Sequence, residues 1–237
     1  MCFALWLEDT DAGFELCNYF WRGKCNERGG MVDMTLSRRF DPDRVKMRRT
    51  ILTGLILFLA GTTEAQPPAG MVLYLQSNSE IYLLLAEHAA NNRGWAGFGG
   101  GAREGEATEE TAAHKAEEES RGYFDRADLL RRIKGQTPVM DGSFATYFAE
   151  VPFVPAQRVI NHAPPDSSDA YLERSTFAWI PYSAITKYVK KEIDQSRKYP
   201  VDPSFLPAGS ETNWFWPIWL GNMRKAHIAK ALPWEKD

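Results

Sequence analysis

The sequence lacks the features of a disulfide-stabilised or zinc-binding protein. It has only 3 cysteines in 237 residues, Cys2, Cys17 and Cys25, and their spacing matches no zinc or redox motif. The cysteine-free remainder suits an oxidising compartment without needing disulfides, although cytosolic domains are often cysteine-poor as well. Histidine is also scarce. Three of the four histidines have no partner at a zinc-ligand spacing, so we expect each to be a surface or hydrogen-bonded side chain. They are His88, His162 and His227.

An excess of basic charge is also missing, which argues against nucleic acid as a main partner. The chain has 28 Lys and Arg against 31 Asp and Glu, and its pI is about 5.9. No internal repeat or low-complexity tract is visible. The 44% hydrophobic and 25% charged content is that of a soluble protein with one core, so we expect one domain plus tails.

No apolar run reaches the roughly 20 residues that a membrane-spanning helix needs. Residues 47–65 have the order of a secretory signal peptide: Met47 with two arginines, an apolar stretch over residues 51–60, and small residues ending at Ala65. A buried core helix is the alternative, but the flanking arginines and the Gln-Pro-Pro that follows favour the signal. We therefore expect a secreted or periplasmic protein with no stable membrane span after cleavage. Because a signal begins a chain, we hypothesise that translation starts at Met47 and that residues 1–46 are a non-native or disordered extension.

The rest of the sequence alternates strand and helix patterns. Strands are predicted at residues 71–76, 80–88 and 175–182, together with a hairpin over residues 137–154 that turns at Asp141-Gly142. Helices are predicted at residues 108–120 with Thr108 as N-cap, 125–135 with Asp125 as N-cap, 182–199 and 223–232. The order lacks a strict parallel βαβ rhythm, so it predicts an α/β fold with a mixed sheet and helices against its faces.

The predicted helix after the glycine-rich loop 97–101 has two different sides. Its alanines fall on one side, which can approach a sheet closely, while Glu118 and Glu119 project together on another. Two adjacent carboxylates repel each other unless a cation lies between them, and oxygen ligands suit Mg²⁺ or Mn²⁺. The simpler interpretation is a solvated, glutamate-rich helix.

The spacing of this segment resembles the box of the Nudix hydrolase family, G-x5-E-x7-R-E-U-x-E-E-x-G-U, where U is aliphatic. Gly100 is followed after five residues by Glu106 and after seven more by His114, and residues 115–119 read Lys-Ala-Glu-Glu-Glu. The preceding "GWAGFGG" and the later "ERSTFAWIPY" are similar to other elements of the family. The resemblance covers about residues 71–191.

The resemblance implies a Nudix-type α/β/α sandwich over residues 70–200, and Mg²⁺- or Mn²⁺-assisted attack of water on a small-molecule substrate in which a diphosphate is linked to another moiety. The implied catalytic and metal-binding residues are Glu118, Glu119 and Glu173, with the carbonyl of Gly99 as a further ligand. The implied structural residues of the box are Gly100, Glu106 and His114, and the implied contact to a substrate phosphate is Lys115.

Three departures from the box weaken the implied metal site. His114 replaces the box arginine, the final glycine comes one residue late as Gly122, and Lys115 replaces a metal-binding glutamate. An ammonium group competes with a divalent ion for carboxylate oxygens and cannot act as a ligand while protonated. Two functions therefore stay open: a Nudix-type hydrolase with weakened activity, or a lapsed domain that binds a phosphorylated ligand.

The C-terminal residues 201–237 form an aromatic-rich extension. The cluster of Trp214, Phe215, Trp216 and Trp219 could stack a nucleobase or rest at a membrane surface, but packing of the extension onto the domain is the favoured interpretation. The lysines at 187, 190 and 191 predict a solvated helix face rather than a phosphate-steering surface.

Overall fold

The computed structural model describes residues 67–88, 92–165, 168–174 and 176–235, together with 7–8 and 15–16. The chain divides into two compact units, Met1–Thr62 and Thr63–Asp237. In the first unit the described residues form one antiparallel strand pair, β1 (Leu7–Glu8) with β2 (Glu15–Leu16). The expected signal peptide at residues 47–65 and the expected translation start at Met47 lie outside the described residues.

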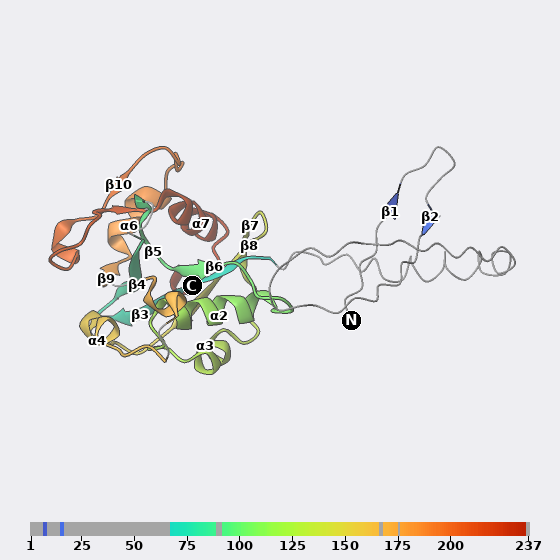
Figure 1. The fold of residues 1–237 in the computed structure, drawn as a ribbon. Helices are drawn as coiled ribbons and strands as arrows, with labels where there is room; N and C mark the ends of the chain where they lie inside the picture. Colours follow the sequence, from blue (N-terminus) through green and yellow to red (C-terminus); the bar gives the residue numbers. More distant parts are fainter. Residues whose placement is uncertain are drawn as a thin grey trace, which may run out of the picture. The chain divides into compact units, whose positions relative to one another are not determined.

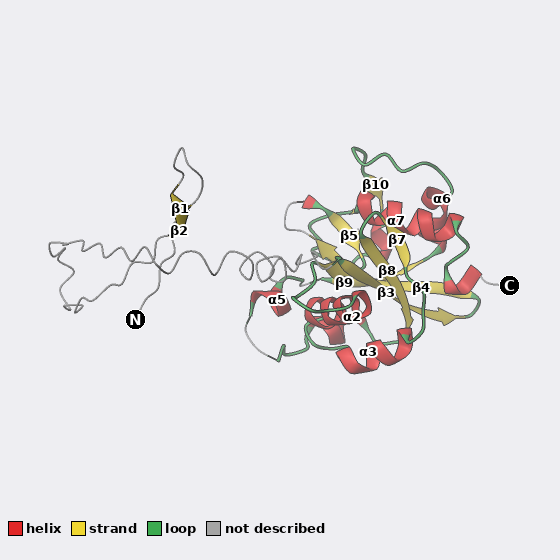
Figure 2. Cartoon of the chain, turned by 90° about the vertical axis from the view of Figure 1, so that its right-hand side faces the viewer, coloured by secondary structure: helices red, strands yellow, loops and turns green. Residues whose placement is uncertain are grey.

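The second unit is a mixed α/β domain built on a nine-stranded sheet (Figures 1 and 2). The strands are β3 (Ala69–Ser77), β4 (Glu80–His88), β5 (Gly94–Ala96), β6 (Phe98–Gly100), β7 (Val139–Asp141), β8 (Phe144–Glu150), β9 (Phe177–Pro181), β10 (Tyr199–Pro200) and β11 (Trp214–Phe215). Their main order is β10-β11-β5-β4-β3-β8-β7, while β6 pairs with β3 and β9 pairs with β4. Two of the pairs, β3 with β8 and β11 with β5, are parallel, so the sheet is mixed as the sequence predicts.

Helices cover both faces of this sheet. They are α2 (Thr108–Glu119), α3 (Arg126–Ile133), α4 (Ala156–Ile160), α5 (Asp169–Leu172), α6 (Ser183–Val189) and α7 (Pro217–Ile228), with short 3-10 turns η3 (Pro203–Phe205) and η4 (Pro233–Glu235). Alternate residues of β3 feed two separate cores: Leu73 packs with α2 and α3, whereas Val72 packs with α6 and α7. Figure 1 shows α2, α3 and α4 below the sheet and α6 and α7 above it.

Several sequence predictions are confirmed. The first hairpin pairs β3 with β4 through a turn at Asn78 and Ser79, and the second pairs β7 with β8. Asp125 caps α3, since its carboxylate accepts a hydrogen bond from the Asp128 N–H at 2.8 Å. Phe215 and Trp219 are buried in the core, as the packing interpretation of the aromatic cluster expects.

Two predicted helices have wrong boundaries. The helix expected over residues 182–199 ends at Val189. Five residues later, Asp194 accepts hydrogen bonds from the N–H and hydroxyl of Ser196 and closes a turn inside the predicted helix. The C-terminal helix, expected from residue 223, begins at Pro217. Proline suits the first turn of a helix because its missing N–H would have no helical partner there. Among the described residues, no helix is long and apolar enough to cross a membrane.

Candidate functional site

Helix α2 lies against the sheet through its small residues. Ala112, Ala113 and Ala116 are fully buried against β3 and its neighbours, as the sequence predicts. The predicted N-cap is wrong by one residue: the cap is Ala107, whose N–H donates to the Glu110 carboxylate at 3.0 Å. The Thr108 hydroxyl instead lies 2.7 Å from the hydroxyl of Tyr147 on β8, a contact that only the tertiary fold creates.

The end of α2 has the hydrogen bonds of a Schellman motif. The N–H of Arg121 donates to Glu118 O at 2.9 Å and the N–H of Gly122 donates to Glu117 O at 2.7 Å. Arg121 therefore stands at the left-handed position, with φ +60°, where the Nudix box has its glycine. The helix end therefore keeps the geometry of a Schellman motif, but Arg121 occupies a left-handed position that glycine adopts with less strain.

Glu106 joins the glycine-rich loop to α2. Its Oε2 accepts a hydrogen bond from the Arg103 N–H at 3.1 Å and lies 3.1 Å from Nδ1 of His114, while its Oε1 lies 3.3 Å from Arg126. Burial alone would raise the pKa of Glu106, but the Arg103 N–H, His114 and Arg126 outweigh it and hold the pKa below its ordinary value. Glu106 and His114 thus lie where a structural role would place them.

Glu118 is surrounded by three basic groups. Its Oε1 lies 2.6 Å from a guanidinium nitrogen of Arg103 and 2.8 Å from Nε2 of His114, and its Oε2 accepts a hydrogen bond from Lys115 Nζ at 2.7 Å. Burial raises the pKa of this carboxyl, yet Lys115 and His114 more than offset it, so the pKa falls below its usual range. The carboxylate charge of Glu118 is therefore neutralised within the protein.

Glu119 is buried against a different basic group, the guanidinium of Arg174. Its Oε2 accepts a hydrogen bond from the Gly99 N–H at 2.9 Å, and its Oε1 accepts one from Arg174 at 2.8 Å. The other terminal nitrogen of Arg174 pairs with the half-exposed Glu173 at 2.8 Å. Burial raises the pKa of Glu119 to about 7, because Arg174 and the Gly99 N–H offset the loss of hydration only in part. The buried guanidinium of Arg174 thus links the carboxylates of Glu119 and Glu173.

Lys115 folds back over the glycine-rich loop. A side chain at Gly100 would meet the Cδ and Cε atoms of Lys115 at 3.2 Å, so the lysine stem packs directly on this glycine. A side chain at Gly99 would come within 2.8 Å of the Gly70 Cα, which explains why the strand β6 has glycine there. The ammonium group of Lys115 donates a hydrogen bond to Glu118.

In this arrangement neither Glu118 nor Glu119 is free to bind a divalent metal ion. Their oxygens already face the exposed Arg103, the partly buried Lys115, the buried Arg174 and a backbone N–H, so an incoming ion would have to displace these cations. No group of three or more His, Cys, Asp or Glu side chains within the described part of the chain has the geometry of a metal site. The two neighbouring glutamates, expected to share one cation, turn to different partners.

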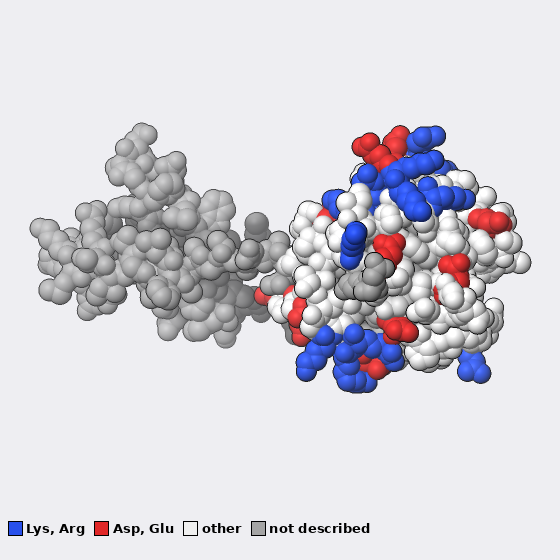
Figure 3. Space-filling model, turned by 180° about the vertical axis from the view of Figure 1, so that it is seen from behind, with Lys and Arg blue, Asp and Glu red and all other residues white. Residues whose placement is uncertain are grey.

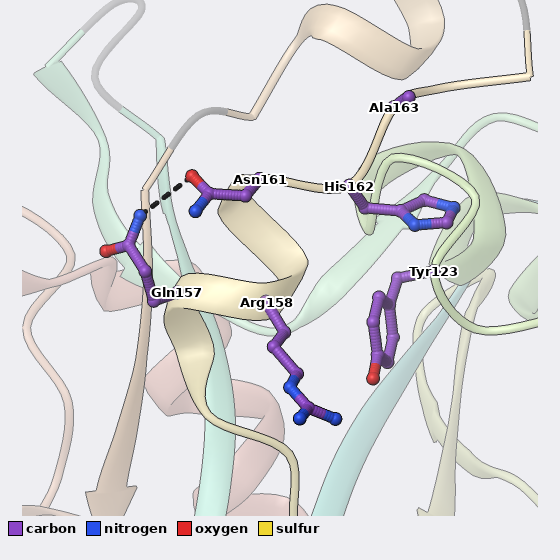
Figure 4. A pocket seen from close by; sticks show the side chains of 6 residues that line it. All are labelled: Tyr123, Gln157, Arg158, Asn161, His162 and Ala163. Carbon is purple, nitrogen blue, oxygen red and sulfur yellow. Dashed lines mark hydrogen bonds between the residues drawn. The ribbon is translucent and has the colours of Figure 1, made fainter.

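A separate hollow of about 410 Å³ lies beside the end of α2 (Figure 4). It is lined by Tyr123, Gln157, Arg158, Asn161, His162 and Ala163. The rings of Tyr123 and His162 meet edge to face at 5.4 Å, and the Gln157 amide donates to Asn161 at 2.9 Å. None of the sequence-predicted site residues lines this hollow.

His88 does not lie at the surface, because its side chain is buried. Within the described residues, no partner meets hydrogen-bonding geometry at its ring nitrogens. Burial, together with the charges of Arg174 and Arg93, lowers its pKa to about 3, although a contact with the Gly97 backbone acts to raise it. The ring packs 5.5 Å from that of Trp216 on the C-terminal segment, which a local sequence pattern does not reveal.

Sequence reasoning also missed Arg103 and Arg174, the two arginines that hold Glu118 and Glu119. The only available signal was their position, one in the loop before Glu106 and the other next to Glu173. The sequence matches no protein-family model, and it matches no curated protein. Support for a Nudix-type site therefore comes from the residues and their arrangement alone.

Proposed function

We propose that residues 70–200 form a Nudix-type α/β/α domain that binds the phosphate groups of a diphosphate-containing small molecule through built-in cations instead of a metal ion. The spacing of Gly100, Glu106, Glu118 and Glu119 supports the family assignment, as does a glycine-rich loop against a helix packed on a mixed sheet. The single observation that carries the metal-free part is the pairing of both glutamates with internal cations.

The basic groups at the loop have donors left for an anion. Lys115 uses one of its three N–H bonds on Glu118, and Arg103 uses one of its five there. The Arg103 side chain is 61% exposed and that of Lys115 is 23% exposed, so both can be reached from solvent. A guanidinium and an ammonium at one loop suit the several oxygens of a diphosphate.

Binding of inorganic pyrophosphate in the presence of a chelator tests this proposal. Titration calorimetry should show binding to the natural chain, and Lys115→Gln and Arg103→Gln should each weaken it about tenfold, the effect of losing one charge-assisted hydrogen bond. Lys134→Gln, an exposed lysine next to α3, is the matched control and should bind as the natural chain does. Equal affinity of all four proteins would contradict the proposal.

A metal-dependent Nudix-type hydrolase with weakened activity is the second candidate. It is favoured by the spacing of Gly100, Glu106, Glu118 and Glu119, which is that of the Nudix box. Phosphate release from nucleoside diphosphate derivatives with Mg²⁺ or Mn²⁺ separates the candidates. Loss of turnover in Glu119→Gln would support the hydrolase, whereas turnover that appears only in Lys115→Glu would support a lapsed enzyme.

A further inference from the structure

The hollow beside the end of α2 is a second place in the domain where a small molecule fits. Its volume of about 410 Å³ lies within the range of small-molecule sites and is far more than a single inorganic ion fills. Its walls come from Tyr123, which follows α2, and from the end of α4 with the residues after it. The proposed phosphate site at the glycine-rich loop uses none of these residues.

The walls of this hollow are fixed to each other. Arg121 Nε donates a hydrogen bond to His162 O at 3.2 Å, and the N–H of His162 donates to the O of the fully buried Val159 at 3.2 Å. A side chain at Gly122 would come within 2.6 Å of the Pro165 Cδ, so the two segments pack closely there. The segment after α4 is therefore held against the end of α2, and the hollow is formed before any ligand arrives.

Three hydrogen-bond donors of the hollow have no acceptor within the described part of the chain. They are the guanidinium of Arg158, the hydroxyl of Tyr123 and the ring of His162. Figure 4 shows the side chains of Arg158 and Tyr123 extending in the same direction, with the His162 ring above the phenol ring. The amides of Gln157 and Asn161, in contrast, bond to each other. These three donors suit an acceptor that comes from outside the protein.

No carboxylate lines the hollow. The acidic residues nearest to Tyr123 in the sequence have partners of their own. Glu117 accepts a hydrogen bond from the Arg126 N–H at 3.1 Å, and Asp125 accepts one from the Asp128 N–H at 2.8 Å. Asp169 lies in α5 and is not part of the walls. An exposed guanidinium with no carboxylate among the lining residues favours an anionic ligand, and its planar fork suits phosphate or carboxylate oxygens.

An aromatic wall lies next to this guanidinium. The rings of Tyr123 and His162 meet edge to face at 5.4 Å, and the ring of Phe124 braces Tyr123 at 5.2 Å. Tyr123 and His162 are half-buried, so part of each ring stays accessible, and Ala163 adds a small apolar contact. A flat apolar wall beside a guanidinium fits a ring that carries an oxyanion.

We propose that this hollow binds a small aromatic molecule that carries a phosphate or carboxylate group. Arg158 binds the oxyanion, the Tyr123 hydroxyl and the His162 ring donate further hydrogen bonds, and the aromatic ring of the ligand packs against Tyr123. The inference does not rest on the proposed function of the glycine-rich loop, since the two sites share no residue.

Titration calorimetry of the full chain with phenyl phosphate and with benzoate tests the proposal. We expect at least one of the two to bind, and the tighter one shows whether the oxyanion is a phosphate or a carboxylate. Inorganic phosphate, which lacks the ring, and phenol, which lacks the oxyanion, should each bind at least about tenfold more weakly than the tighter probe.

Two variants locate the bound probe. Arg158→Gln should weaken binding about tenfold or more, the effect of losing a charge-assisted hydrogen bond. Tyr123→Phe keeps the ring and removes only the hydroxyl, so it should weaken binding by about fivefold. Pyrophosphate binding should be unchanged in Arg158→Gln, because the proposed phosphate site does not include this arginine.

The matched control is Arg197→Gln, which removes an equally exposed arginine in the segment before β10. Figure 3 shows Lys and Arg gathered, together with Asp and Glu, at the top of the molecule, where Figure 1 places α6, β10 and α7. An anion held there by overall charge would respond to Arg197→Gln, whereas a ligand in the hollow would not.

Three results would overturn the proposal. The first is that neither phenyl phosphate nor benzoate binds the natural chain. The second is an equal loss of affinity in Arg158→Gln and Arg197→Gln, which would show an effect of overall charge. The third is a loss in Lys115→Gln but not in Arg158→Gln, which would place the probe at the glycine-rich loop.

Discussion

Replacing Arg174 by methionine should strongly destabilise the domain. Arg174 and Glu119 have side chains exposed by only 4% and 3%, and their nitrogen and oxygen lie 2.8 Å apart. At a pH above the pKa of Glu119, where its carboxylate is charged, removing one partner of this buried ion pair leaves the other charge without compensation, which costs about 3–5 kcal/mol. For a domain of this size the melting temperature should fall by about 6–20 °C. The half-exposed pair of Arg174 with Glu173 adds at most about 1 kcal/mol.

Denaturant unfolding followed by circular dichroism measures this loss. A double-mutant cycle with Glu119→Gln isolates the pair, because the neutral amide no longer needs the guanidinium. We expect the double variant to regain most of the stability that Arg174→Met loses. A loss below about 1 kcal/mol in Arg174→Met, as for an exposed arginine such as Arg131, would refute the view that this guanidinium compensates the buried carboxylate.

Two further predictions concern His88 and Arg121. The pKa of His88 is lowered from 6.5 to about 3 in the folded state, so the unfolded chain takes up a proton first as the pH falls. The natural protein should therefore lose about 1.2 kcal/mol of unfolding free energy, relative to His88→Gln, between pH 7 and about pH 5.5. A pH-independent difference between the two proteins would contradict this. Because Arg121 has φ +60°, the Arg121→Gly protein should have an unfolding free energy about 1 kcal/mol higher than that of Arg121→Ala. Both variants lose the hydrogen bond from Arg121 to His162 O, so equal thermal stability of Arg121→Gly and Arg121→Ala would rule out backbone strain at this position.

Local patterns predicted the elements that depend on local chemistry. The hairpin signalled by Asp141-Gly142, the Asp125 cap and the alanine side of α2 each follow from a few neighbouring residues. The structure has all three, with the hairpin turn itself at Gly142 and Ser143. The same reliance on local pattern made the predicted helix at 182–199 too long. Its pattern continues past Val189, but that part of the chain instead forms a turn at Asp194 and the strand β10, which pairs with β11.

The electrostatics of the site could be predicted only in part. The spacing placed Glu118 and Glu119 on a helix beside a glycine-rich loop, and it identified Lys115 as the residue that disturbs a metal site. It did not reveal Arg174, which follows a different helix and reaches Glu119 across 55 residues of sequence. Pairings of this kind depend on how distant segments pack, and a single sequence does not encode them in a readable local pattern.

Mn²⁺ and pyrophosphate titrations of the natural chain test most directly whether internal cations have replaced the metal ion. The account predicts that pyrophosphate binds with the same affinity in a chelator and in Mn²⁺, and that Mn²⁺ alone does not bind. Pyrophosphate binding that requires Mn²⁺ would contradict it and restore Glu118 and Glu119 as metal ligands.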